Sequence, residues 1–386
     1  MLAIDGQAMV DPRATRRGTG RFLVRTLQDF YRNADSIPHR PTIIFQLTEL
    51  VTEETIRASL HRVGATADTN VVALPRVGKG PSVAMSYNAR RELEQMKVEQ
   101  IQNLGVTNLW LPTLFTGWMD SSVASIETST GIKTLLTHLD FSAIQWLDEL
   151  PLSIMNWYWD RIAYTGRAHK IHSISHAALT EANTLLPEMP EHFVQWLGVD
   201  DFRHELDGSS KKKARGETIF VMTAPDVHKN LSVVIEAWTT LRDEGKAVRL
   251  IVGGAKGTKA FWTSRMDRKG FRGVKFVEDL SDTDRNFFYK NAKAVICPSK
   301  NEGFGLTLAE ALVSNQQVFF SNIPAHLELA GTEVNSFDPD CAEQLLDLMR
   351  MSLSSQANLP TPPTFYSTRF TWEGAGVRII SELADL

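Results

Sequence analysis

The residues best suited to chemistry lie in the segment Ser299–Leu312, where an apolar strand leads through a glycine turn into a helix. Unpaired backbone N–H groups at the start of a helix attract anions, and Gly303 and Gly305 allow a ligand to approach the backbone closely. Glu302 and Glu310 bracket this turn eight residues apart. We expect a phosphate to bind at the turn. Glu302 would then lie beside the chemical group attached to the phosphate, and Glu310 would accept hydrogen bonds from a ribose diol. A solvated helix start, with acids that suit the helix dipole, is the plainer alternative.

The segment Pro225–Leu231 has a similar place, between a predicted strand and the helix that follows it. It contains Lys229, and a lysine at such a position can neutralise a diphosphate leaving group. The alternative is a surface lysine close to the start of a helix. Together, the two segments predict a site for a molecule that carries a diphosphate.

Both segments resemble the retaining GT-B glycosyltransferases of the family 4 type, whose signature is a glutamate, seven residues and a second glutamate. The match is carried by Glu302, Gly303, Phe304, Gly305, Leu306 and Glu310. The resemblance implies that the first glutamate contacts the donor sugar, that the glycine turn binds the phosphates, and that the second glutamate holds the ribose. It also implies that Lys229, within the run His-Lys-Asn-Leu, stabilises the leaving diphosphate.

The chain departs from this family directly after the strand that precedes Lys229. The family shows a glycine and then an arginine or a similar polar residue there, whereas this chain has Thr223 and Ala224. Part of the diphosphate clamp must then come from elsewhere, and Arg21 and Lys256 are the substitutes considered. The departure bears on leaving-group stabilisation more than on donor binding.

A second glycine pair lies near the start of the chain. Gly18 and Gly20 follow two arginines and open a basic helix, which is similar to the glycine loop that closes over the donor phosphates in the family. A plain helix N-terminal turn is the alternative. A nicotinamide site needs a third glycine and an acid about 20 residues further on, and apolar residues follow here instead. The resemblance therefore implies that both glycines bind the donor.

A histidine and a serine of the first half are similar to residues of the family at the ends of strands. His138 stands two residues before Asp140, where the family has an adjacent His-Asp pair. The resemblance implies that His138 contacts the donor sugar or the acceptor, and a structural histidine at a strand end is the alternative. Ser175 is predicted to cap a helix. The run Phe370–Trp372 matches the opening of the family's C-terminal helix.

Parallel strands that end at one edge of a sheet are needed to position these segments. Short apolar runs alternate with longer amphipathic ones, which is typical of an α/β protein. The predicted strands of the first half are Leu2–Ile4, Thr42–Gln46, Val71–Leu74, Asn108–Leu111, Lys133–Thr137 and Lys170–Ser173. Those of the second half are Thr218–Thr223, Ala247–Val252, Val274–Phe276, Ala294–Cys297 and Gln317–Phe320. The predicted helices are Arg21–Tyr31, Asn88–Leu104, Asn230–Glu244, Asp282–Ala292 and Thr307–Val313.

A polar, glycine-bearing stretch with three consecutive lysines separates the two series of strands. We predict the GT-B arrangement, in which two Rossmann-like, doubly wound α/β domains face a central cleft. The predicted parts are an N-terminal acceptor-side domain at residues 1–200, a linker at 201–216, a nucleotide-sugar-binding domain at 217–369 and a bracing C-terminal helix at 370–386.

The composition sets limits on the class of protein. A chain of 386 residues is long enough for two domains, and a net charge of −4 gives no overall attraction to nucleic acid. The two cysteines form no zinc motif, and Cys297 is predicted to be a buried thiol at a strand end. No apolar run approaches the roughly 20 residues that span a bilayer, and no signal peptide is expected. We expect a cytoplasmic protein and leave peripheral contact with the membrane open.

These features predict a glycosyltransferase that moves a hexose-type sugar, with retention, from a nucleotide-sugar donor to a saccharide or lipid-linked saccharide acceptor. Surface polysaccharide or glycolipid synthesis is the process that the family suggests. No cofactor is expected, and no metal is implied, because no Asp-x-Asp triplet stands in a loop suited to a diphosphate-bound cation. Two alternatives remain open: a catalytically silent nucleotide-sugar-binding scaffold subunit, and a GT-B-like epimerase.

Overall fold

The computed structural model describes most of the chain, namely residues 1–11, 18–33, 40–199, 217–314, 317–331, 333–354 and 370–386. The chain divides into two compact units. Unit 1 comprises Met1–Leu197 and Trp372–Leu386, and unit 2 comprises Gly198–Thr371. The predicted linker, residues 201–216, and the arginines that precede Gly18 lie outside the described residues.

Unit 1 is built on a seven-stranded sheet with the order β3-β2-β1-β4-β5-β6-β7, in which all pairs are parallel. Its strands are β1 (Leu2–Asp5), β2 (Thr42–Gln46), β3 (Val71–Leu74), β4 (Asn108–Leu111), β5 (Lys133–His138), β6 (Lys170–Ser173) and β7 (Glu191–Val194). The central strands are buried almost throughout, as expected for a parallel sheet covered on both faces. The winding direction reverses between β1 and β4, which makes the unit doubly wound.

Six helices accompany this sheet in the described part of unit 1. They are α1 (Gly18–Arg32), α2 (Glu53–Val63), α3 (Tyr87–Asn103), α4 (Leu152–Thr165), α5 (His176–Leu185) and α13 (Ala375–Ala384). Short 3₁₀ turns lie at η1 (Gln7–Met9), η3 (Ser82–Ala84), η4 (Thr128–Thr130) and η5 (Ser142–Glu149). The hydroxyl of Ser175 accepts a hydrogen bond from the backbone N–H of Ala178 and so caps α5, as predicted.

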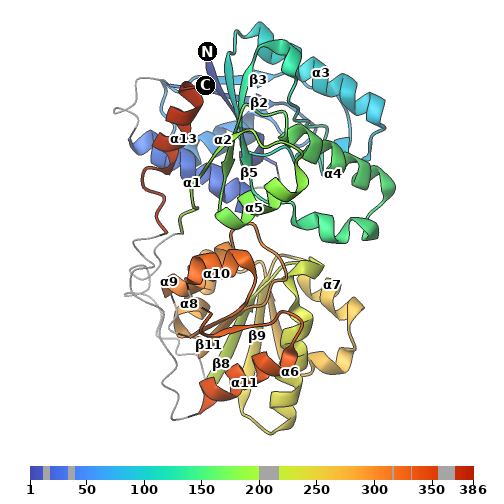
Figure 1. Ribbon diagram of the computed structural model, residues 1–386, viewed down its shortest axis with the longest axis vertical. Helices are drawn as coiled ribbons and strands as arrows, with labels where there is room; N and C mark the ends of the chain where they lie inside the picture. The colour runs from blue at the N-terminus through green and yellow to red at the C-terminus, as the bar shows by residue number, and fades with distance from the viewer. Residues whose placement is uncertain (12–17, 34–39, 200–216, 315–316, 332, 355–369) are drawn as a thin grey trace. The chain divides into compact units, whose positions relative to one another are not determined.

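The C-terminal helix α13 returns to unit 1 and packs along α1 (Figure 1). The backbone N–H of Gly376 donates to the Asp29 carboxylate at 2.9 Å. A methyl group at Gly376 would come within 2.2 Å of the Thr26 carbonyl oxygen, so this close approach requires glycine. The two ends of the chain are therefore joined in one unit.

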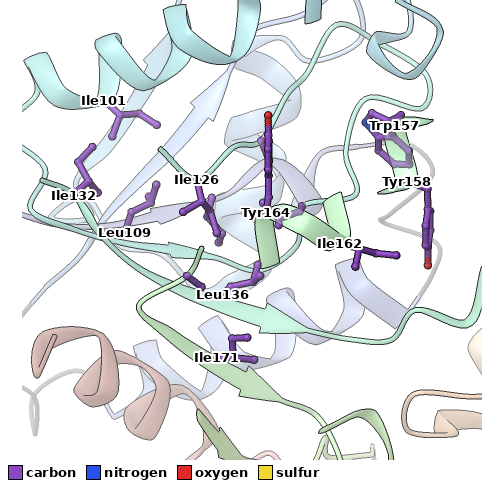
Figure 2. Close-up of a cluster of buried hydrophobic side chains, with 14 of the residues drawn as sticks. Ile101, Leu109, Ile126, Ile132, Leu136, Trp157, Tyr158, Ile162, Tyr164 and Ile171 are labelled. Atoms are coloured by element: carbon purple, nitrogen blue, oxygen red, sulfur yellow. The ribbon is translucent and has the colours of Figure 1, made fainter. Parts of the chain in front are cut away.

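The core of unit 1 lies between the sheet and helices α3 and α4 (Figure 2). Isoleucine and leucine side chains of the strands and helices meet there with Trp157, Tyr158 and Tyr164. Charged side chains are also enclosed: the carboxylate of Glu94 accepts hydrogen bonds from Arg161 and Arg91, both at 2.6 Å. The pair with Arg161 ties α3 to α4, whereas Arg91 pairs with Glu94 within α3, and a buried carboxylate is stable only when it is paired.

Unit 2 has a six-stranded parallel sheet with the order β10-β9-β8-β11-β12-β13. Its strands are β8 (Glu217–Met222), β9 (Val248–Gly254), β10 (Val274–Glu278), β11 (Ala294–Cys297), β12 (Val318–Ser321) and β13 (Ser336–Phe337). Its helices are α6 (Leu231–Asp243), α7 (Thr258–Arg265), α8 (Asp282–Asn291), α9 (Leu306–Ser314), α10 (Pro324–Ala330) and α11 (Ala342–Leu353), with 3₁₀ turns η6 (Val227–Lys229) and η7 (Arg268–Phe271). The winding reverses between β8 and β11.

The two doubly wound, parallel α/β units confirm the predicted fold class of each half. Among the described residues, no helix combines the length and the apolar character needed to cross a membrane. In unit 2 the reversal between β8 and β11 matters most, because ligands of open α/β sheets bind at the carboxyl ends of the strands where the winding reverses.

Candidate functional site

The loops that follow β8 and β11 lie side by side at this reversal point. The strands themselves are hydrogen-bonded neighbours, with Phe220 opposite Val295. Beyond them, the backbone N–H of Lys300 donates to the His228 carbonyl oxygen at 2.8 Å. The side-chain amide of Asn230 donates to the Pro298 carbonyl oxygen at 3.1 Å. The two segments selected from the sequence are therefore fixed to each other by one main-chain and one side-chain hydrogen bond.

Lys229 and Glu302 meet between these loops. The Lys229 Nζ atom lies 2.5 Å from Glu302 Oε1, and the Ser299 hydroxyl donates to the same oxygen at 2.7 Å. The two charged side chains are 22% and 15% exposed, so a ligand can still reach them. Burial tends to raise the pKa of Glu302, but the positive charges of Lys229 and His228 outweigh it and lower that pKa to about 2. The carboxylate is thus ionised at neutral pH, and both of its oxygens can accept hydrogen bonds from hydroxyl groups.

The turn between Glu302 and α9 has the geometry that the glycines predict. Gly305 has a φ of 91°, a left-handed conformation that residues with a side chain rarely adopt. Phe304 is buried and packs edge-on against Phe370, with the ring centroids 6.1 Å apart. Helix α9 begins at Leu306, so its first amides follow the turn directly. The buried phenylalanine anchors the turn that leads into α9, and the start of a helix is a place where anions bind.

His326 is a residue of this site that the sequence analysis missed. It lies in α10, one strand further along the sheet, and only 1% of its surface is exposed. Its Nδ1 atom is 3.1 Å from both the hydroxyl and the carbonyl oxygen of Ser321. A methyl group at Gly305 would come within 3.0 Å of the imidazole Cδ2 atom. The ring therefore packs against the glycine turn, and only the position of Pro324 after a strand signalled a helix start here.

Glu310 lies one helical turn inside α9, as predicted, but it is only 2% exposed. The hydroxyl of Tyr289 donates to its Oε2 atom at 3.1 Å, and the Nε atom of Arg285 lies 4.0 Å from the same oxygen. Both partners come from α8 and were not selected from the sequence. The structure thus holds this carboxylate against α8, and its contact with a ribose stays a prediction.

Thr223 and Ala224 follow β8, where the family has a glycine and an arginine. Thr223 is buried, and its hydroxyl has no hydrogen-bond partner within the described part of the chain. The carbonyl oxygen of Ala224 accepts a hydrogen bond from the indole N–H of Trp262 at 3.1 Å. Lys256 lies in the loop after β9 and Arg21 lies in α1 of unit 1, and the substitution of either for the arginine stays a prediction.

His138 belongs to unit 1, where it ends β5 and is 3% exposed. Its Nε2 atom is 3.9 Å from the Glu181 carboxylate, and its ring centroid lies 4.3 Å from that of Phe141. Burial lowers the pKa of His138 to about 4, although the charge of Asp140 opposes this shift. Asp140 itself accepts hydrogen bonds from the backbone N–H and hydroxyl of Ser142. The role of His138 toward a sugar stays a prediction.

Gly18 and Gly20 also belong to unit 1. They lie in the first turn of α1 and have no left-handed φ. The residues before Gly18 fall outside the described part of the chain, so the predicted phosphate loop is untested there. In unit 2, Cys297 is buried at the end of β11, as predicted, and burial raises the pKa of its thiol.

Two sequence comparisons bear on the site. The model of a family described as glycosyl transferases group 1 matches residues 202–361. The O-antigen chain mannosyltransferase RfbU of Salmonella typhimurium is 25% identical over 130 residues, which are 34% of this chain and 36% of the relative. The chain thus matches about a third of the length of this curated relative. Together they support a transferase.

Solved structures decide the fold. A glycosyltransferase from Rickettsia africae aligns with 100% of this chain and 97% of its own, at a TM-score of 0.65 and 15% identity. HepE of Anabaena, in complex with UDP and glucose, has a TM-score of 0.67 and 14% sequence identity, with 100% of this chain and 99% of its own aligned. The sucrose-phosphate synthase of Thermosynechococcus elongatus has a TM-score of 0.68 and 13% sequence identity, again with 100% of this chain and 99% of its own aligned. The fold is that of the GT-B glycosyltransferases.

The candidate site of this GT-B chain lies within the range that matches group 1. Lys229, Glu302, Glu310 and His326 all fall between residues 202 and 361. In GT-B terms, the site is the strand-end region of the C-terminal Rossmann-like unit, and it is built from the loops after β8, β11 and β12.

Proposed function

We propose that this protein is a retaining glycosyltransferase of the family 4 type, which transfers a hexose-type sugar from a nucleotide-sugar donor. The observation that carries the proposal is the Lys229–Glu302 pair beside the left-handed Gly305 turn. A cation, an ionised acid and the start of a helix stand there at the reversal point of a parallel sheet. This is the arrangement that an activated sugar with a diphosphate needs.

The chemistry assigned to the site follows from charge. When the bond from the anomeric carbon to the diphosphate breaks, negative charge grows on the phosphate oxygens and positive charge on the sugar. Lys229 and the first amides of α9 stabilise the phosphates, because fixed donors stabilise charge without reorganising. Glu302 accepts hydrogen bonds from sugar hydroxyls and orients the ring. Retention fits a front-face reaction, in which the leaving phosphate takes the proton of the acceptor hydroxyl.

Glu310 is proposed to hold the ribose of the donor. Its carboxylate lies one helical turn beyond the phosphate turn and is ordered by the Tyr289 hydroxyl. Gly303, Phe304, Gly305 and Leu306 form the phosphate part of the donor site. Gly18 and Gly20 of unit 1 are proposed as donor-binding residues, and His138 of the same unit as a residue that contacts the sugar or the acceptor.

The sugar and the process are proposed from the relatives. The curated relative is a mannosyltransferase of the O-antigen chain, and one structural neighbour is in complex with UDP and glucose. Both names favour a hexose, and the first favours a saccharide or lipid-linked saccharide acceptor in surface polysaccharide synthesis. We propose that the reaction takes place in the cytoplasm, leave contact with the inner face of the membrane open, and assign the reaction no metal and no cofactor.

A catalytically silent, nucleotide-sugar-binding scaffold subunit is the second candidate. Two observations favour it: Ala224 stands where the family has an arginine, and Asp140 is bonded to Ser142 rather than paired with His138. An epimerase on the same two-unit plan would use the same donor site. Transfer of the sugar to an acceptor separates the enzyme from both alternatives.

The experiment is a thermal-shift panel of UDP, GDP, UDP-glucose and GDP-mannose, followed by assays of sugar transfer and donor hydrolysis. A nucleotide sugar at about 100 times its Kd should raise the Tm by about 5 to 10 °C, because it binds only the folded state. Lys229→Met should lose this shift, and Lys246→Met, at an exposed position beyond α6, should keep it. No shift with any of the four ligands contradicts the proposal, and a shift without transfer or hydrolysis favours the scaffold subunit.

A further inference from the structure

The hydrogen bonds of His326 fix where its proton lies. The Ser321 hydroxyl donates its proton to the Ser299 carbonyl oxygen. Toward the imidazole, both the hydroxyl and the carbonyl of Ser321 can therefore only accept, and both lie 3.1 Å from Nδ1. The Nδ1 atom must then carry a hydrogen.

The other ring nitrogen is consequently an acceptor. Burial lowers the pKa of His326 to about 4, even though the charge of Glu302 opposes this shift. The ring is neutral at pH 7, with its one proton on Nδ1 and a lone pair on Nε2. Among the described residues, no hydrogen-bond donor is recorded for this Nε2 atom. The side chain is only 1% exposed as a whole, but its Nε2 atom is not among the fully buried atoms without a partner in the described part of the chain, so a donor from outside the chain can reach it.

The free edge of the ring faces the glycine turn. A methyl group built on Gly305 would lie 3.0 Å from Cδ2 and 3.4 Å from Nε2. The same turn carries Glu302 three residues earlier. The charge of Glu302 raises the pKa of the imidazole and that of Lys229 lowers it, so both charges act on the ring. An ionised diphosphate has only acceptor oxygens and cannot pair with a lone pair, whereas a sugar hydroxyl can donate to it.

We propose that Nε2 of His326 accepts a hydrogen bond from a hydroxyl of the donor sugar, which makes His326 a specificity-determining residue. This rests on the proposed function, because it needs a nucleotide sugar in the site. The imidazole can bind a hydroxyl of the sugar but not the phosphates of the donor, because only the hydroxyl can donate a hydrogen bond. Glu302 and His326 together select a sugar whose hydroxyls donate to two separate acceptors.

The test compares nucleoside diphosphates with nucleotide sugars by titration calorimetry, using UDP, GDP, UDP-glucose and GDP-mannose. His326→Asn keeps an amide donor near the Nδ1 position and removes the acceptor at Nε2. We expect it to bind the preferred nucleotide sugar about 3- to 10-fold more weakly, the worth of one neutral hydrogen bond, with nucleoside diphosphate affinity unchanged. His326→Gln, whose amide reaches the Nε2 position, should recover part of the loss.

A purely structural histidine would give a different result. His326→Asn would then weaken both kinds of ligand equally or neither, and either outcome overturns the proposal. Ser321→Ala removes one Nδ1 contact but retains Nε2, so it should keep the ratio of the two affinities. If the wild-type protein binds nucleoside diphosphates but no nucleotide sugar, or binds none of the four ligands, the proposed function itself fails and this proposal with it.

The wild-type protein supplies a second test that needs no variant. Replacing a sugar hydroxyl by fluorine leaves a weak acceptor but removes the donor. Analogues of the preferred nucleotide sugar, each with one hydroxyl replaced, should include one that binds about 3- to 10-fold more weakly and loses this difference in His326→Asn. Equal affinity for all the analogues contradicts the assignment.

Discussion

The ammonium group of Lys229 lies 2.5 Å from the carboxylate of Glu302, although the two residues are 73 positions apart in the chain. Neighbouring strands β8 and β11 bring their loops together, and the Asn230 amide locks them. The pair balances two opposite charges at the point where a diphosphate is proposed to bind. The ligand would compete with Glu302 for the lysine and so release the carboxylate for the sugar.

The first prediction concerns the energy of this pair. Lys229→Met leaves Glu302 enclosed without its main counter-charge, whereas the double variant with Glu302→Gln removes both charges. We expect the double variant to recover about 1 to 3 kcal/mol of the free energy of unfolding relative to the sum of the single effects. Urea denaturation of the four proteins measures this coupling.

The exposed pair of Lys300 and Asp340 is a matched control. It has the same separation of 2.5 Å, but its side chains are 39% and 72% exposed. Its coupling should stay below about 1 kcal/mol because water screens it. Equal coupling in the two pairs would show that enclosure of Lys229 and Glu302 has no energetic role.

The second prediction concerns the glycine turn. Gly305 and Gly257 have nearly the same positive φ, 91° and 92°. A methyl group meets the His326 ring at the first position and open space at the second. Gly257→Ala should cost about 1 kcal/mol of stability, and Gly305→Ala about 1 to 3 kcal/mol more because the ring must move. Only Gly305→Ala should also weaken UDP or GDP binding. Equal losses of stability in both variants would contradict the packing described here.

The third prediction separates the ribose from the phosphates. Glu310→Gln should lower the affinity for the preferred nucleoside diphosphate by about 10-fold, because hydrogen bonds to a charged group contribute about 1.5 to 3 kcal/mol. It should leave the affinity for inorganic pyrophosphate unchanged. Tyr289→Phe removes the hydroxyl that orders Glu310 and should give a smaller loss with the same selectivity. A parallel loss of pyrophosphate binding in Glu310→Gln would place Glu310 elsewhere.

The fourth prediction is a pH dependence of stability. Burial lowers the pKa of His138, His172 and His326 from 6.5 to about 4. The unfolded chain takes up protons at these positions below pH 6.5, whereas the folded chain does so only near pH 4. The stabilising effect is complete above pH 6.5 and decreases as the pH falls toward 4, by up to about 1.4 kcal/mol per pH unit for each histidine.

Urea denaturation at pH 7.5, 6 and 5 measures this slope. His172→Gln removes one of these histidines from unit 1. The free energy of unfolding of that unit should then depend less steeply on pH, by about 1.4 kcal/mol per pH unit, which corresponds to one proton. The lowered pKa of Glu302 acts in a separate window, because its stabilising effect is lost only as the pH falls from 4.5 toward about 2. Identical free energies at pH 7.5 and 5 would contradict the buried, neutral state of these histidines.

The strands could be predicted well because their signal is local. Thr42–Gln46, Val71–Leu74 and Ala294–Cys297 occur with the predicted bounds, since each is a short apolar run between polar segments. The strand Glu191–Val194 was not predicted, because its exposed edge position leaves no apolar run. The helix Leu152–Thr165 was not predicted either. It has many apolar residues, but they are spread around the helix and do not mark one face.

The candidate site could be predicted from the sequence where a short segment carries a recognisable motif. Glu302, Gly305 and Glu310 stand in a single turn and helix, and their spacing together with the resemblance to the family indicates a ligand. His326 and Tyr289 reach the same site from other elements, and only the folded chain shows their contacts. The sequence predicted one site for Lys229 and Glu302 but not their direct contact, because that contact depends on which strands are neighbours.

The most direct test of the central claim is amide NMR of the protein titrated with UDP and GDP. If the diphosphate binds to the backbone of the turn, the amide resonances of Gly303, Gly305 and Leu306 should shift the most and do so with one common Kd. Those shifts should disappear in Lys229→Met at the same ligand concentration. Shifts confined to other parts of the chain, with these three amides unchanged, would contradict a donor site at this turn.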